Sequence, residues 1–192
     1  MRTSHLSAAV LILLGLFMTP GIALPGPLRL AEVKPLPQAS TQRTALEYVQ
    51  NVAANDLFEL ASARLALQKS KSAEVRKFAS LIIAVHTDMS RDMKTALAVA
   101  TIHPILPVAL DSSHNALMTQ LKSAHGSEFD TRYIQQQVDA HEIVLEMHQS
   151  FARRGEDVSL KRFAADAETK VDRDLAEAQT ISHSLGGLLP RA

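Results

Sequence analysis

The sequence contains no cysteine and no tryptophan, and only 4% of its residues are aromatic. Without cysteine there can be no disulfide, no thiolate metal ligand, no cysteine nucleophile and no lipid-modified N-terminal cysteine. The shortage of rings leaves few platforms on which bases or sugars can stack. The core must therefore consist of Ala, Leu, Val, Ile and Met, a composition that suits closely packed helices.

Net charge is also lacking, because 20 basic and 20 acidic side chains cancel. Such a chain has no long-range field that attracts nucleic acid, so no nucleic-acid partner is expected. The sequence has no Gly-x-Ser-x-Gly elbow, phosphate-binding loop, Gly-rich dinucleotide turn or His-Glu-x-x-His motif, which removes support for seryl or nucleotide chemistry. With 192 residues, 46% of them apolar, the chain is long enough for one domain with a real core.

The N-terminus has the organisation of a secretory signal peptide. Arg2 supplies a positive charge, residues 6–18 form an apolar run, and Gly21-Ile22-Ala23 offers small residues where signal peptidase reads them. We expect residues 1–23 to be removed by cleavage after Ala23, giving a periplasmic or secreted protein. The alternative is an uncleaved anchor, but the run is shorter than the ~20 residues that span a bilayer. No transmembrane span is expected in the mature chain.

Helical spacing of apolar residues begins after a Pro-rich linker at residues 24–40 and continues almost to the C-terminus. It predicts an all-α protein, a ferritin-like four-helix bundle at residues 41–185 with a short crossover helix, followed by a tail at 186–192. The predicted helices cover about 41–69, 72–100, 111–124, 128–153 and 157–184.

Polar residues interrupt these apolar stripes. On the first helix the predicted stripe comprises Leu46, Val49, Ala53, Leu57, Leu60 and Leu67. On the later helices, aliphatic neighbours three and four residues away predict an inward or core-edge position for His86, His141, His148 and Asp174. Burying these groups without partners costs about 1–3 kcal/mol each, so something must satisfy them.

Counting from the helical turns tests whether these groups can meet. Glu59 lies 12 residues before Lys71 and His86 lies 15 after it; His141 lies 15 before Glu156 and Asp174 lies 18 after it. Each antiparallel pair is thus offset by about three residues, or roughly 4.5 Å, which side chains can bridge. The count predicts a mid-bundle metal site of Glu59, His86, His141 and Asp174 for a divalent ion such as Fe, Zn or Mn.

A different interpretation is that the polar residues only fix helix register. Glu59–His86 and His141–Asp174 would then be two hydrogen-bonded pairs, with Asp56 beside Glu59 on the same helix face. A lone histidine in a helical seam is more often a satisfied core residue than a metal ligand.

Two further metal signatures are weak or absent. Ile83 and Val138 stand where the Glu-x-x-His motif of di-iron bundles requires glutamate, which disfavours a two-iron oxidase. Met89 and Met93 are too few for a copper-binding stripe, and core filling explains them better. Four histidines without regular spacing are expected to be incidental surface residues: His103, His114, His125 and His183.

Four segments together resemble a known bacterial family. They are KFASLIIAVH at 77–86, LP at 106–107, EFDTRYIQQQVDAH at 128–141 and LKRFA at 160–164. In order and spacing they are similar to the domain of unknown function 4142, over about residues 41–181. The resemblance implies a ferritin-like helical bundle in an exported protein, of a kind often labelled an outer-membrane protein.

The resemblance also implies a set of site residues. Members of the family tend to carry Glu on the first helix, His on the second and third, and a further His near the end of the last. These positions correspond to Glu59, His86, His141 and Asp174, so the last one departs from the family pattern. Val85 likewise replaces an acidic residue that often precedes the second-helix histidine.

Two functional hypotheses follow. In the first, which the sequence favours, the protein is a non-catalytic binding or stress-related bundle of the periplasm, and an unknown protein or envelope partner uses its outer faces. In the second, it is a metal-binding ferritin-like protein with the four predicted ligands. Neither hypothesis assigns it an enzymatic activity.

Overall fold

Helices account for most of the chain that the structure describes. The computed structural model describes residues 37–186, with side chains from Thr44 onward. Its helices are α1 (Pro37–Lys69), α2 (Ala73–Val99), α3 (Ser112–Ser123), α4 (Gly126–Arg154) and α5 (Val158–Ser184). The described residues form no strand, so the predicted all-α class is confirmed.

Several predicted segments lie outside the described residues. They include the signal peptide with its cleavage site after Ala23, and the part of the linker that precedes residue 37. The first helix begins at Pro37, inside the predicted linker. Proline is favoured in the first turn of a helix because the N–H that it lacks would have no partner there.

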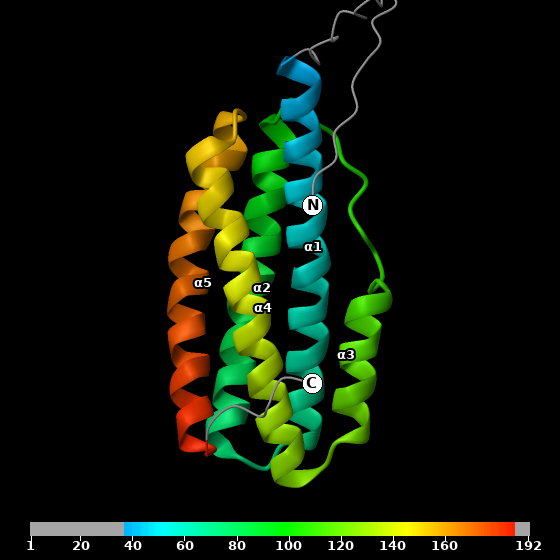
Figure 1. Cartoon of the computed structure of the whole chain (residues 1–192), viewed down its shortest axis with the longest axis vertical. Helices are drawn as coiled ribbons and strands as arrows, with labels where there is room; N and C mark the ends of the chain where they lie inside the picture. The colour runs from blue at the N-terminus through cyan, green and yellow to red at the C-terminus, as the bar shows by residue number, and fades with distance from the viewer. Residues whose placement is uncertain (1–36, 187–192) are drawn as a thin grey trace, which may run out of the picture. The chain divides into compact units, whose positions relative to one another are not determined.

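The four long helices α1, α2, α4 and α5 lie side by side, and each is antiparallel to its neighbours (Figure 1). α1 and α5 each pack against both α2 and α4, so α2 and α4 are diagonally opposed and run in the same direction. α3 lies outside this group, against α1 and α4. No described helix has an apolar stretch long enough to cross a membrane.

Side-chain caps fix where the helices begin. The Ser72 hydroxyl accepts a hydrogen bond from the N–H of Val75 at 3.3 Å and so caps the start of α2. Asp111 caps α3 and Asp157 caps α5 in the same way. Gly126 begins α4 with φ +57°, a conformation that costs other residues energy. The turns therefore have the positions that the count from Lys71 and Glu156 assumed.

Only two of the six residues predicted for the apolar stripe of α1 are fully buried. Val49 and Ala53 are buried, but Leu46, Leu57, Leu60 and Leu67 are only partly buried. α1 packs against α2, α3 and α4, so a wide arc of its surface is covered. That arc includes polar side chains, each at most 8% exposed: Asn55, Asp56, Glu59 and Ser62.

Candidate metal centre

Three of the four predicted ligands meet between the long helices. Glu59 of α1, His86 of α2 and His141 of α4 each offer one ligand atom, and these atoms lie within 4.8 Å of one another. The three residues are at most 1% exposed. The rings of His86 and His141 meet edge to face, with 5.6 Å between their centroids. The offset estimated from the turns was therefore small enough for side chains to bridge.

His86 is oriented through one nitrogen only. Its Nδ1 lies 2.7 Å from Oδ1 of Asp56, and the Ser90 hydroxyl donates to the other Asp56 oxygen at 2.5 Å. The register interpretation had paired His86 with Glu59; the partner is instead Asp56, one turn earlier on α1. Nε2 of His86 is buried and has no hydrogen-bond partner among the described residues.

His141 shows the same arrangement. Its Nδ1 donates to the Gln137 carbonyl oxygen at 2.8 Å, which leaves Nε2 buried without a partner in the described part of the chain. Oε1 of Glu59 lies 3.7 Å from Nδ1, too far for a hydrogen bond. Both oxygens of Glu59 are buried and lack partners within the described region. Nε2 of each imidazole is thus buried and unpartnered, in a cluster that also contains the Glu59 carboxyl group.

Asp174 of α5 is buried in the same polar cluster but stands apart from the three-residue group. Its Oδ1 accepts hydrogen bonds from the neighbouring Arg173, so the predicted His141–Asp174 pair does not form. Its Oδ2 is buried without a partner among the described residues. The charge of Asp174 still raises the pKa of both Glu59 and His86.

Burial dominates the electrostatics of the cluster. It raises the pKa of Glu59 to about 7, although the charge of His86 and the nearby Gln137 amide act in the opposite direction. Burial also lowers the pKa of His141 to about 3, helped by the charge of His86. For His86, burial acts to lower the pKa, but the hydrogen bond to Asp56 and the charge of Glu59 outweigh it and the pKa is raised. His141 is therefore a neutral imidazole, the form that binds metals.

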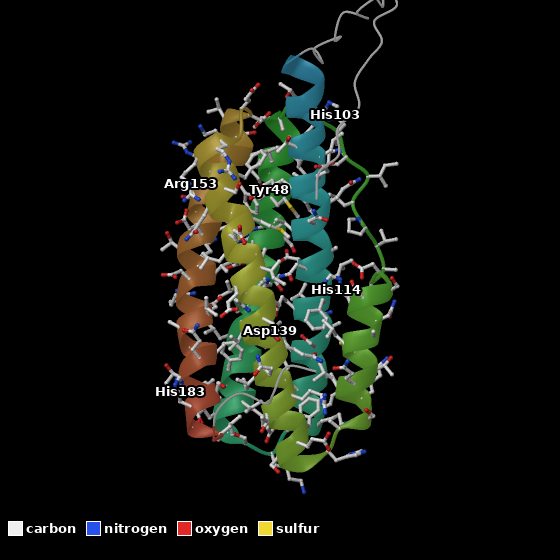
Figure 2. The ribbon with its side chains drawn as sticks, viewed as in Figure 1. Tyr48, His103, His114, Asp139, Arg153 and His183 are labelled. Atoms are coloured by element: carbon white, nitrogen blue, oxygen red, sulfur yellow. The ribbon has the colours of Figure 1, made fainter. Side chains whose placement is uncertain are left out.

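A third buried histidine, His148 of α4, lies nearer to the start of α1 than His86 and His141 do. Nδ1 of His148 is 2.8 Å from the Tyr48 hydroxyl, and Nε2 again lacks a partner within the described region. Figure 2 labels Tyr48, which comes from α1 and is only 6% exposed. The spacing of α4 predicted that His148 points inward, but no sequence signal identified Tyr48 as its partner.

The chain matches the model of one protein family over residues 31–181, and that family is described as "Domain of unknown function (DUF4142)". This chain belongs to that family. The match confirms the resemblance seen in the four sequence segments. No curated protein sequence matches the chain.

Two solved structures have folds similar to that of this DUF4142 protein. A Streptomyces coelicolor protein described as secreted and as DUF305 is 15% identical, with a TM-score of 0.61 over 76% of this chain and 94% of that chain. CopM in its Cu(II)-bound form is 18% identical, with a TM-score of 0.60 over 71% of this chain and 94% of that chain. At these identities the likeness establishes a shared helical fold.

The remaining histidines of this DUF4142 protein do not join the cluster. His103, His125 and His183 are exposed, and Figure 2 shows His103 and His183 at the edges of the helical group. His114 is half-buried rather than on the surface, because its ring stacks on Phe58 with 5.1 Å between centroids. The sequence could not indicate this, because α3 must first fold back onto α1.

Two open grooves of the DUF4142 domain lie away from the cluster. One of about 990 Å³ runs between the end of α2 and the start of α5, and one of about 330 Å³ lies between α1, α3 and α4. Neither is lined by Glu59, His86, His141 or Asp174. The polar cluster is therefore an interior site rather than the floor of either groove.

Proposed function

We propose that this protein is an exported metal-binding protein in which Glu59, His86 and His141 hold one divalent first-row transition-metal ion. The observation that carries the proposal is the set of unpartnered buried atoms: both Glu59 oxygens and Nε2 of each histidine. An unsatisfied buried polar atom costs about 1–3 kcal/mol. One metal ion would satisfy the three residues together, because a donor atom from each lies within 4.8 Å of the others.

The hydrogen bonds around the histidines also support the proposal. Metal-binding histidines typically donate their other ring N–H to a carboxylate or a backbone carbonyl, which fixes the ring and its tautomer. The Asp56 carboxylate does this for His86, and the Gln137 carbonyl does it for His141. This arrangement leaves each Nε2 as the available donor.

Asp174 stands apart from the three residues, and its unpartnered Oδ2 would supply a fourth ligand once the side chain moves towards the ion. Two imidazole nitrogens and two carboxylate oxygens suit zinc in tetrahedral geometry and copper(II) in tetragonal geometry. Such a site binds copper(II) and zinc more tightly than iron(II) or manganese(II), according to the general affinity order of divalent ions. CopM, whose solved structure is in a Cu(II)-bound form, shares the helical fold of this chain. Copper(II) is therefore the first ion to test.

The proposal includes the cellular setting and the finer fold. We propose that residues 1–23 are a cleaved signal peptide, and that the four long helices with α3 in the crossover form a ferritin-like four-helix bundle. The fold shared with a protein described as secreted is consistent with export. Because Ile83 and Val138 replace the glutamates of a di-iron centre, the role is metal binding or buffering rather than oxidase chemistry.

Equilibrium dialysis with elemental analysis tests the proposal. Mature protein without an affinity tag is stripped with a chelator and dialysed against copper(II) or zinc. We expect the wild-type protein to bind about one ion per chain at this site of histidine and carboxylate ligands. The double variant His86→Ala/His141→Ala should lose that ion. Protein isolated from its own cell envelope should carry the same metal.

The matched control is His183→Ala, which removes an exposed histidine from α5 and should bind metal like the wild type. Circular dichroism establishes that each variant is folded. Metal-free wild-type protein after dialysis, or equal metal binding by the folded double variant, would exclude the proposed site. It would leave the register interpretation, in which a partner binds the outer helix faces.

A further inference from the structure

His148 is a buried imidazole without an assigned role. Its side chain is fully buried, at 0% exposure, and Nε2 has no hydrogen-bond partner in the described part of the chain. The Tyr48 hydroxyl holds Nδ1 at 2.8 Å, so the ring is fixed from the α1 side. Phe163 of α5 contacts the ring edge to face, with 5.9 Å between centroids. The free nitrogen therefore belongs to an oriented imidazole in an apolar environment.

Helix geometry brings Met93 to the level of His148. His86 and Met93 on α2 are seven residues apart, and so are His141 and His148 on α4. The two helices run in the same direction, and the rings of His86 and His141 are neighbours. At 1.5 Å per residue, Met93 and His148 both lie about 10 Å along the bundle from the Glu59–His86–His141 group, which is called the lower cluster below. Met89 lies one turn before Met93, on the same buried face of α2.

The surroundings favour a soft ligand set. Met89 and Met93 are 1% and 2% exposed and belong to the same buried cluster as Tyr48 and Phe163, the two rings that contact His148. Ala167 of α5 is also buried in this cluster. Thioether sulfur and imidazole nitrogen are donors that suit copper(I), whereas zinc and manganese prefer sites with more nitrogen or oxygen.

We propose that Nε2 of His148 and the sulfur atoms of Met89 and Met93 form a second metal site, selective for copper(I). The two methionines alone are too few for a copper site, but the buried histidine supplies a third donor. The site is distinct from the Glu59–His86–His141 cluster in position and in ligand chemistry. It stands whether or not the lower cluster binds a metal.

Copper(I) titration of the double variant Met89→Leu/Met93→Leu tests this site. Leucine for methionine conserves volume, so the helices should still pack. Copper(I) is supplied with ascorbate under nitrogen, in competition with a chromogenic copper(I) chelator. Loss of two of three donors should weaken copper(I) binding by roughly 100-fold or more. X-ray absorption of the copper(I) complex with both methionines present, in the same background as the titration, should show sulfur neighbours around copper.

The titration is done in the His86→Ala/His141→Ala background, so that copper at the lower cluster does not contribute. Met118→Leu, a buried methionine in the other half of the core, is the matched control and should bind copper(I) normally. Circular dichroism and thermal unfolding establish that the variants fold. The second site would be overturned if the folded Met89→Leu/Met93→Leu change left the copper(I) affinity unaltered, or if the copper spectrum showed only nitrogen and oxygen neighbours. Neither result would affect the proposal for the lower cluster.

Discussion

Replacing Glu59 by methionine should stabilise the metal-free protein. Glu59 is 0% exposed, and neither carboxyl oxygen has a hydrogen-bond partner among the described residues. Methionine has a similar length, fills the same space and carries no oxygen. Because an unsatisfied buried polar group costs about 1–3 kcal/mol, the Glu59→Met variant should gain about that much free energy of unfolding. For a domain of this size, the melting temperature should rise by about 2–4 °C per kcal/mol.

The assay is urea denaturation near neutral pH in the presence of a chelator. Asp56→Leu is the matched control, because Asp56 is also a buried carboxylate of α1 but both of its oxygens are hydrogen-bonded, to His86 and Ser90. Removing those bonds leaves Nδ1 of the buried His86 and the hydroxyl of the partly buried Ser90 unpaired, so this control should lose about 2–4 kcal/mol. Two similar substitutions one turn apart should therefore change stability in opposite directions.

Adding metal should reverse the order of wild type and Glu59→Met. An ion at 100 times its dissociation constant adds about 2.7 kcal/mol to the free energy of unfolding of a protein that binds it. The variant lacks the bound carboxylate and should gain much less. If Glu59→Met instead destabilises the metal-free protein by more than about 1 kcal/mol, the carboxyl group is already satisfied without a metal, and the argument from its unpartnered oxygens is wrong.

Three further results are expected. Asp56→Asn should weaken metal binding at His86 by about 10–100-fold in a chelator competition, because the ring loses its charged acceptor. Asp157→Ala should cost about 1 kcal/mol in urea unfolding near neutral pH. The pKa of Asp157 is lowered to about 2, because its hydrogen bonds outweigh the opposing effect of burial, so the stabilisation is present above the ordinary pKa and that cost should vanish as the pH falls towards 2. Gly155→Ala should lower the melting temperature, because its Cβ would lie 2.6 Å from Cε1 of Phe151 and 2.7 Å from the Phe151 oxygen.

The sequence predicted α2 and α5 most accurately, because their apolar spacing is regular and their caps are recognisable. Ser72 and Asp157 precede these helices as side-chain caps. In each of these two helices, buried residues recur at alternating steps of four and three, from Val75 to Met93 and from Leu160 to Ile181, so one face of the helix is buried. Local signals were sufficient wherever a helix buries a single stripe.

On α1, packing against the other helices decides which side chains are buried, and the sequence did not predict this. Leu57 and Leu60 are only partly buried, whereas Asp56 and Glu59 are almost completely buried. Burial of these carboxylates depends on partners from other helices, and hydrophobic periodicity carries no information about such partners. The count from the turns located the cluster to within about one helical turn, which does not decide whether His86 bonds Asp56 or Glu59.

The three buried histidines together favour ligand binding over register fixing. A histidine kept only for packing gains most when both of its nitrogens are satisfied, since an unpaired buried nitrogen costs free energy. His86, His141 and His148 each have Nδ1 held and Nε2 unpaired, with three different partners: a carboxylate, a backbone carbonyl and a phenol. Burial lowers the pKa of His141 to about 3 and that of His148 to about 4, so both rings are neutral at ordinary pH. Because a metal ion requires an oriented neutral imidazole with a free nitrogen, the arrangement of His141 and His148 supports the proposed metal binding, although it weakens the metal-free protein.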